Sequence, residues 1–189
     1  MDSTWKTIPS DWSMDTCNKK ILCVRCPNSC RCVLRKLKTY TSPKKYPHSF
    51  SPKKKAGVLM TSTDGDKTKI LVVQSRGRLW GIPKGGIENG ENEMDCAFRE
   101  LYEETGIKLD KKKSDVAATI RMKHGQYFFL PNQPKHELKL ADCNDSTGVG
   151  WITKDCLKSL LMRKLVRFTA DFSRIIDLPL INEKTREKM

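Results

Sequence analysis

Long apolar runs are absent from this 189-residue chain. No stretch approaches the roughly 18–20 residues of a membrane-spanning helix, so we expect no membrane contact. The opening residues Met1–Lys6 also lack the apolar core of a secretory signal, which favours a cytoplasmic protein. The composition shows none of the bias of collagen-like, coiled-coil or mucin-like chains. With 38% apolar residues, the chain is expected to fold around a core of its own.

Acidic residues are scarce in the first part of the chain. Residues 1–55 contain 13 Lys and Arg but only three acids, a net charge of +10 out of +14 for the whole chain. Such a positive field favours phosphate-rich partners, although charge alone identifies none. We divide the chain into a basic, Cys-rich N-terminal segment over 1–55, a folded domain over 56–180 and a polar tail over 181–189.

Five of the eight cysteines lie in the same N-terminal segment. Cys23-x-x-Cys26 has the spacing of a metal-binding knuckle, and Cys30 and Cys32 could complete the four ligands of a candidate zinc site. Structural zinc sites usually join two knuckles across a longer loop, so reduced thiols packed in a small element are the alternative. Disulfides are not expected without a signal peptide.

The order of the predicted elements indicates an α/β sandwich. Apolar residues predict strands at these positions: 56–60, 70–74, 116–121, 126–130, 149–152 and a further short one at 137–141. Thr63–Asp66 is a turn signal between the first two strands and predicts a hairpin. A Gly-rich loop over 76–90 precedes a helix over 91–105, which Gly106 ends. Helical spacing of apolar residues over 157–176 predicts a helix near the C-terminus.

The predicted central helix and the residues just before it are strongly acidic. Residues 88–104 contain seven acids and one base. At about 100° per residue, Glu100, Glu103 and Glu104 share one face of the helix. The adjacent face is apolar and should pack on the sheet: Met94, Ala97 and Leu101. Three converging carboxylates suit a hard cation such as Mg²⁺ or Mn²⁺. A solvated acidic face is the alternative, although the preceding glycines favour a ligand site.

Seven fixed residues and two apolar ones across 85–107 carry a resemblance to a known family. The stretch Gly85-x5-Glu91-x7-Arg99-Glu100-Leu101-x-Glu103-Glu104-x-Gly106-Ile107 matches every fixed position of the Nudix box. The chain therefore resembles the Nudix hydrolases, with flanking strands extending the resemblance to about 56–180. It implies an α/β/α sandwich with a mixed sheet. It also implies divalent-metal-dependent hydrolysis of a nucleoside diphosphate linked to another group.

The resemblance also assigns roles to the box residues. Glu103 and Glu104 match the main metal ligands of the family, and Glu100 matches the third carboxylate of that site. Arg99 matches the residue that orients the carboxylates through an ion pair with Glu91. These four residues, Glu103, Glu104, Glu100 and Arg99, are the expected catalytic residues of the box.

A general base often lies outside the box in this family, in a loop before a late strand. Asp145 precedes Trp151 by six residues, similar to the acidic position of decapping relatives, where Glu is more usual. The stretch 144–148 is also well suited to a plain turn. Glu137 is the rival candidate for the base.

The residues leading into the box resemble one branch of the family. Trp80-Gly81-Ile82-Pro83-Lys84-Gly85-Gly86 is similar to a stretch of messenger-RNA decapping enzymes, known in eukaryotes and large DNA viruses. The resemblance implies Trp80 and Lys84 as substrate-binding residues and the Gly85 carbonyl as part of the metal shell. A solvent-facing loop lysine is the alternative for Lys84. Diphosphoinositol polyphosphate hydrolases share part of this pattern.

Three functions stay open on the sequence. The first is an enzyme that cleaves the 5′ cap of RNA to a capped nucleoside diphosphate and 5′-monophosphate RNA, in the host cytoplasm if the source is viral. The second is a hydrolase of dinucleotide polyphosphates or diphosphoinositol polyphosphates. The third is an RNA-binding module with a vestigial Nudix box. RNA is favoured by the basic segment 1–55, because a long polyanion can follow an extended positive surface.

Overall fold

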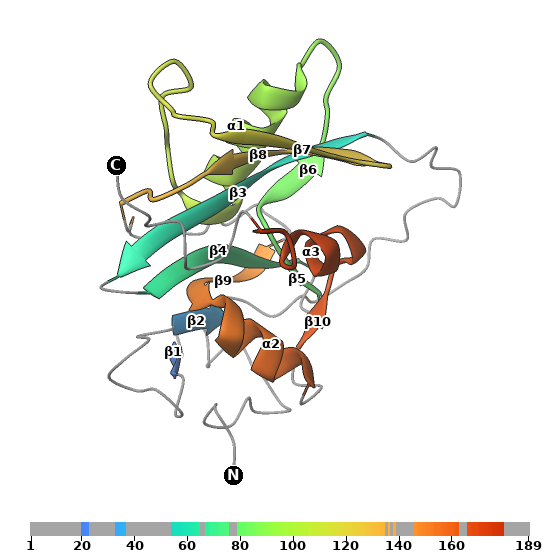
Figure 1. Ribbon diagram of the computed structural model, residues 1–189. Coiled ribbons are helices and arrows are strands. Elements are labelled where there is room, and N and C mark those ends of the chain that lie inside the picture. The colour runs from blue at the N-terminus through green and yellow to red at the C-terminus, as the bar shows by residue number, and fades with distance from the viewer. Residues whose placement is uncertain are drawn as a thin grey trace.

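One long strand organises the sheet of this protein. The computed structural model describes the following residues: 20–22, 33–36, 54–64, 67–75, 79–134, 136, 138, 146–162 and 166–179. Strand β3 (Lys55–Asp64) pairs in parallel with β8 (Gly125–Leu130) along its first six residues. Its last four residues pair antiparallel with β4 (Lys67–Ser75), the hairpin that the sequence predicts. Strand β7 (Ala118–Met122) pairs with β8, and β9 (Ser146–Thr153) pairs with β4. The sheet is therefore mixed (Figure 1).

A short N-terminal hairpin extends this sheet beyond β9. Strand β1 (Lys20–Leu22) pairs antiparallel with β2 (Val33–Lys36), and β2 pairs antiparallel with β9. Both strands belong to the basic segment assigned to residues 1–55. With Lys55 of β3, eight residues of that segment are therefore part of the same sheet as the folded domain, although the predicted boundary itself stays a prediction.

The Gly-rich region expected as a loop contains two short strands. Strand β5 (Leu79–Gly81) pairs with β4 and with β10 (Arg167–Phe168), while β6 (Lys84–Gly86) pairs with the start of β3. Gly57 permits the second pairing, because a side chain there would overlap Pro83 and Lys84. Residues 84–86 are therefore held as a strand beside β3.

Helices cover both faces of the sheet and complete an α/β/α sandwich (Figure 1). Helix α1 (Glu93–Thr105) packs on one face, and α2 (Lys154–Met162) and α3 (Ala170–Ile175) pack on the other. Alternation along β4 divides its side chains between two cores. Ile70 and Val72 face α2 and α3, whereas Leu71 and Val73 face α1. The expected packing residues of α1 lie in that second core: Met94, Ala97 and Leu101.

The C-terminal part differs from the single helical pattern seen in the sequence. Helix α2 ends at Met162, β10 intervenes, and α3 begins after Thr169. The Thr169 hydroxyl accepts the backbone N–H of Phe172 at 3.4 Å and so caps α3. Parallel pairing of β10 with β5 then prevents one continuous helix. The short strand predicted over 137–141 falls mostly outside the described residues.

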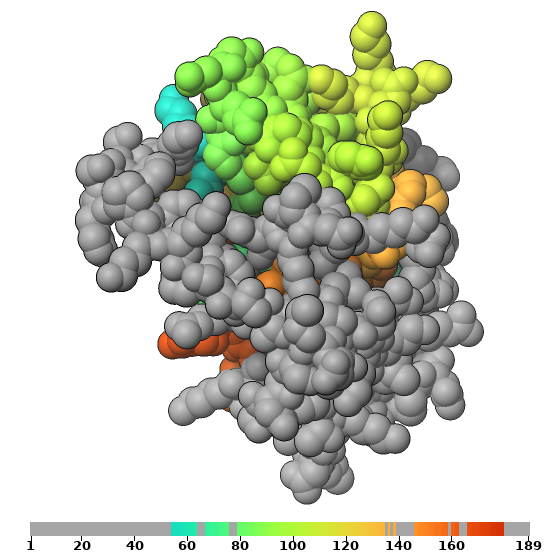
Figure 2. All heavy atoms as spheres, turned by 180° about the vertical axis from the view of Figure 1, so that it is seen from behind, coloured from blue at the N-terminus to red at the C-terminus, as the bar shows by residue number. Residues whose placement is uncertain are grey.

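The reverse view shows one broad, continuous surface formed by α1 and the residues after it, coloured green to yellow (Figure 2). Within the described part of the chain, no helix combines the length and apolarity needed to span a membrane.

Candidate active site

Helix α1 has a defined cap at each end. The Asn92 side chain accepts the backbone N–H of Asp95 at 2.9 Å. At the other end, Gly106 adopts a φ of 75° and donates its N–H to the carbonyl of Tyr102 at 2.8 Å. The left-handed conformation costs glycine little, so Gly106 ends the helix at the residue that the sequence indicated. The register of the acidic residues along the helix is thereby fixed.

The three glutamates of this helix lie at different depths. Glu104 is buried, with 4% of its surface exposed. The Glu100 side chain is mostly buried, whereas that of Glu103 is 43% exposed. Helical spacing places the three on one stripe, and that stripe runs from the core to the solvent. Burial raises the pKa of Glu100, against the opposing effect of Arg99.

Arg99 holds the acidic residues of the box together. Its Nε and Nη2 donate to the two carboxylate oxygens of Glu91, each at 2.9 Å, so the expected ion pair is present. Its Nη1 donates to Glu100 at 2.8 Å and to Glu103 at 3.2 Å. The hydrogen bonds from Arg99 lower the pKa of Glu91 to about 2. One guanidinium therefore fixes three carboxylates.

Gly85 lies directly against the carboxyl group of Glu100. A Cβ atom built on Gly85 would overlap that carboxyl group, so the position has no room for a side chain. The Gly85 carbonyl oxygen accepts from the Cys96 thiol at 3.7 Å, so it is oriented toward α1. The box glycine thus allows the loop and the helix to approach closely.

Glu104 is a buried carboxylate with two hydrogen-bond donors. The backbone N–H of Lys84 donates to Oε2 at 2.9 Å, and the Ser146 hydroxyl donates to Oε1 at 2.7 Å. Burial nevertheless raises the pKa of Glu104 to about 8. The sequence offered a turn over 144–148 as one alternative and did not indicate Ser146 as a site residue. It is instead the first residue of β9, adjacent in sequence to the predicted base Asp145.

The side chain of Lys84 points to α3. Its Nζ lies 3.3 Å from Oδ2 of Asp171, 3.4 Å from the Thr169 hydroxyl and 5.6 Å from the centre of the Tyr127 ring. The Tyr127 hydroxyl donates to the same Asp171 carboxylate. Burial lowers the pKa of Lys84, against the effect of Asp171. Burial acts to raise the pKa of Asp171, but Tyr127 and Lys84 together hold it below its usual value.

Sequence reasoning missed Asp171, Thr169 and the hydroxyl of Tyr127. A Thr followed two residues later by Asp is a helix-start signal, so the beginning of α3 was detectable. Its contact with Lys84 was not, because that contact joins residues 87 positions apart.

The donor set of the site suits a hard divalent cation. Carboxylate oxygens of Glu100, Glu103 and Glu104 and a nearby backbone carbonyl are the ligand types that Mg²⁺ and Mn²⁺ prefer. In the described part of the chain, no three acidic, His or Cys side chains are arranged to hold a metal ion. Glu100 and Glu103 share Arg99 instead. The exposed Glu103 can change rotamer at little packing cost.

Other predicted site residues lie elsewhere. The Trp80 side chain is 5% exposed and belongs to the core beneath α2 and α3, so it is a packing residue in this structure and offers little surface to a substrate. The candidate zinc ligands and both candidate bases fall outside the described residues: Cys23, Cys26, Cys30, Cys32, Asp145 and Glu137. Cys96 and Cys156 are buried cysteines, and burial raises the pKa of Cys96 to about 12.

The Gly-rich residues 81–90 before α1 (the box loop) lie against Arg99 and the glutamates. This arrangement agrees with a match to a known family. A family model of the NUDIX domain matches residues 52–172. The chain belongs to the Nudix family. Family membership supports a pyrophosphohydrolase activity, and Nudix hydrolases generally use divalent metals such as Mg²⁺ or Mn²⁺. The resemblance inferred from residues 85–107 is thereby confirmed.

Two relatives illustrate what the chain is similar to. It is 34% identical over 120 residues to hydrolase 111R of Invertebrate iridescent virus 3, covering 61% of this chain and 67% of that protein. It is 38% identical over 55 residues to mRNA decapping complex subunit 2 of Schizosaccharomyces pombe. That match covers 28% of this chain but only 7% of the yeast protein, so it relates one segment of the two proteins.

A solved structure supports the fold. A bifunctional NMN adenylyltransferase/ADP ribose pyrophosphatase from Francisella tularensis, complexed with AMP and a manganese ion, superposes with a TM-score of 0.51. The two are 24% identical over 68% of this chain and 41% of that one. At this identity the likeness concerns the fold, which is the predicted α/β/α sandwich.

Proposed function

We propose that this Nudix hydrolase removes the 5′ cap of RNA in the cytoplasm. The products are a capped nucleoside diphosphate and a 5′-monophosphate RNA. The observation that carries the hydrolytic part is the set of glutamates on α1, with Glu100 and Glu103 bound by Arg99 and Glu104 anchored to the box loop. The RNA part rests on similarity and charge.

Hydrolysis of a diphosphate linkage requires carboxylates that bind metal and a carboxylate that accepts a proton. Water attacks one phosphorus of the diphosphate linkage, a new P–O bond forms and the bridging P–O bond breaks. A divalent cation held by Glu100, Glu103 and Glu104 would offset the phosphate charge and acidify water. Glu103 is the most exposed of the three and can accept the proton of the attacking water. Arg99 keeps Glu100 and Glu103 oriented.

The Gly-rich loop contributes in a second way. The backbone of Lys84 is anchored to Glu104, and its side chain is anchored to Asp171. A phosphate that displaces Asp171 from the ammonium would gain a charge-assisted hydrogen bond. Lys84 is therefore assigned to substrate phosphate, with Asp171 as its partner before substrate binds.

RNA is favoured over small nucleotides by two facts. The net charge of +14 suits a long polyanion, whose binding grows with each neutralised phosphate. The match to a decapping subunit also covers 28% of this chain. The competing substrates are dinucleotide polyphosphates and diphosphoinositol polyphosphates, and the competing function is RNA binding by an inactive box.

A parallel hydrolysis assay tests the proposal. Cap-labelled RNA, free cap dinucleotide, diadenosine tetraphosphate and a diphosphoinositol polyphosphate are each incubated with the protein and Mg²⁺ or Mn²⁺. Release of capped nucleoside diphosphate from the long RNA, with a much lower kcat/KM for the small substrates, is expected. Equal or better turnover of a small substrate would overturn the assignment to RNA.

A binding measurement separates the inactive alternative. Tight RNA binding without release of any product, with either metal, would favour the vestigial box. The Glu103→Gln variant provides the background rate, so that a contaminating hydrolase is not mistaken for activity of this protein.

A further inference from the structure

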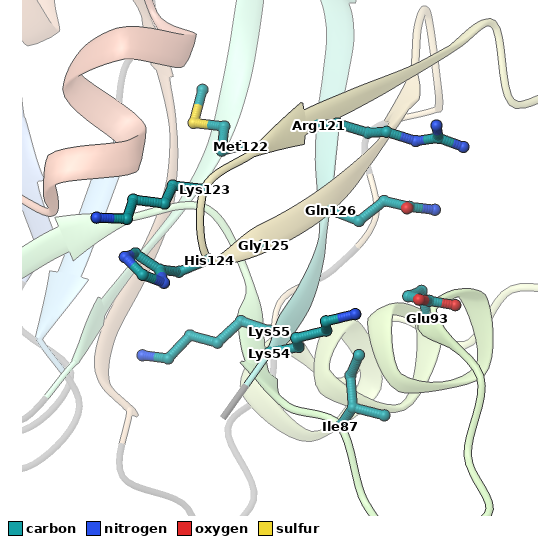
Figure 3. Close-up of a pocket in the computed structure, with 10 residues that line it drawn as sticks. All are labelled: Lys54, Lys55, Ile87, Glu93, Arg121, Met122, Lys123, His124, Gly125 and Gln126. Carbon is teal, nitrogen blue, oxygen red and sulfur yellow. The ribbon is translucent and has the colours of Figure 1, made fainter. Parts of the chain in front are cut away.

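A basic pocket lies beside the box loop, and none of the glutamates of the carboxylate site lines it. It has a volume of about 140 Å³ and is open to solvent. Figure 3 shows its lining, which comes from the start of β3, the turn between β7 and β8, and the first turn of α1. Five basic residues and one acid, Glu93, contribute to it. The basic residues are Lys54, Lys55, Arg121, Lys123 and His124.

The pocket adjoins the box loop through strand pairing. Lys55 is the register partner of Gly86 on one side of β3 and of Gly125 on the other. Adjacent strands lie about 4.8 Å apart, so the β7–β8 turn is roughly 10 Å from Gly86. This distance is short compared with the length of an RNA strand that extends from the box loop. Phosphates next to the cleaved linkage can therefore reach the pocket.

The backbone around the pocket is held in place. The N–H of Lys55 donates to the carbonyl of His124 at 3.0 Å, and the N–H of Ile87 donates to the carbonyl of Lys54 at 3.1 Å. These bonds join β3, the β7–β8 turn and the end of the box loop. The basic side chains therefore project from a defined frame.

Two cations of the pocket have no acidic partner among the described residues. Arg121 and Lys123 are exposed and make no ion pair with any described residue, in contrast to Lys84 and Lys111, which pair with acids. Cations gathered around a hollow with a single acid at its margin attract an anion. The hollow accommodates several waters, and so a hydrated phosphate group.

We propose that this pocket binds backbone phosphates of the RNA strand downstream of the cleaved linkage. Lys54 and Lys55 are the last residues of the basic N-terminal segment. Arg121, Lys123 and His124 add a contribution from the folded domain that charge counting along the sequence did not identify. The inference rests on the proposed function for its substrate, but its binding test does not require hydrolysis.

The test compares two double variants of equal charge. Arg121→Gln with Lys123→Gln removes two cations from the pocket. Lys67→Gln with Lys158→Gln removes two elsewhere. Lys67 begins β4 opposite Asp64, the last residue of β3, about 30 Å along that strand from Lys55, and Lys158 lies on α2. Binding of an uncapped 5′-monophosphate RNA of ~20 nucleotides is measured by fluorescence anisotropy over a range of salt concentrations.

The pocket variant is expected to weaken RNA binding about tenfold. Its slope of log affinity against log salt should fall by about 1.4, since each lost contact to single-stranded nucleic acid removes about 0.7. The control variant should change binding by less than about threefold, because long-range charge is screened. Thermal melting of each variant verifies that it is folded. Equal weakening by the two variants would overturn the proposal, because it would show only a loss of net charge.

Two further arms identify the source of the phosphates. Inositol hexakisphosphate is titrated into both variants, and a selective loss for this ligand with RNA binding unchanged would overturn the assignment to RNA. In the hydrolysis arm, the pocket variant should raise KM for capped RNA more than KM for the cap dinucleotide. If the wild-type protein cleaves no capped RNA, the proposed function fails, and the anisotropy measurement still decides the pocket.

Discussion

The ammonium nitrogen of Lys84 lies 3.3 Å from Oδ2 of Asp171 and joins the box loop to α3. Both side chains are largely buried, and the Tyr127 hydroxyl donates to the same carboxylate. Because Lys84 also binds Glu104 through its backbone, one residue connects the glutamate stripe with the opposite layer of the sandwich. The loop position therefore depends on a helix near the C-terminus.

We expect the Lys84–Asp171 pair to couple energetically. Lys84→Met, Asp171→Asn and the double variant form a cycle measured by urea unfolding. Removing one partner leaves the other charge poorly compensated, so each single variant should lose about 1–3 kcal/mol. The double variant should lose less than the sum, with a coupling of about 1–2 kcal/mol. Simple additivity would show that the contact contributes little to stability.

Glu103→Gln should abolish most turnover while keeping the fold. The amide cannot accept the proton of water and is a poorer metal ligand, so kcat should fall by about 10²–10⁴. The melting temperature should stay near the wild-type value, because the side chain is 43% exposed. Glu88→Gln, at an exposed loop residue before the helix, is the matched control and should retain activity. Near-normal kcat in Glu103→Gln would contradict the assigned role.

Gly85→Ala should displace Glu100. The added methyl group would overlap the Glu100 carboxyl group, so we expect a loss of about 1–3 kcal/mol in stability together with loss of activity. Gly85→Ala combined with Glu100→Ala should regain most of the stability and none of the activity. Chemical denaturation and a rate assay measure the two effects. An unchanged denaturation midpoint in the single variant would show that the loop can move away from α1.

Stability should depend on pH through Glu91. Arg99 lowers the pKa of Glu91 to about 2 from an ordinary value near 4.5, so its contribution is present above pH 4.5 and is lost as pH falls toward 2. Glu91→Gln should therefore be less stable than wild type by about 1–3 kcal/mol at pH 7. The difference should shrink between pH 4.5 and 2 in urea unfolding. A difference that is constant with pH would contradict the ion pair as its source.

Ser146→Ala should raise the metal concentration needed for activity and should also lower stability. The variant removes one donor from buried Glu104, so we expect a loss of about 1–3 kcal/mol in stability. The concentration of Mg²⁺ or Mn²⁺ at half-maximal activity should also rise, because Glu104 is less well oriented. Ser114→Ala, which removes an exposed serine hydrogen bond, is the control. If both variants show the same metal dependence, Ser146 has only a structural role.

Local sequence patterns predicted several features of the fold and of the site. Helical periodicity identified the stripe of Glu100, Glu103 and Glu104, and Gly106 indicated the end of the helix. Strand alternation and the turn at 63–66 predicted the hairpin of β3 and β4. The spacing of the box residues indicated the family. These residues lie in one loop and the helix that follows it, so their spacing in the sequence constrains how they can be arranged. Each of these inferences concerns residues near one another in the chain, so few geometries satisfy them.

Tertiary structure alone decided the depth and the partners of these residues. Periodicity gives the direction of a side chain and not how far the neighbouring layers cover it, so the burial of Glu104 could not be read from spacing. Ser146 and Asp171 reach the site from β9 and α3, at separations of 42 and 87 residues from their partners. The basic pocket likewise forms where β3 meets the β7–β8 turn, because parallel pairing brings residues 54–55 beside 121–124. Contacts of this kind depend on the packing of the whole sheet.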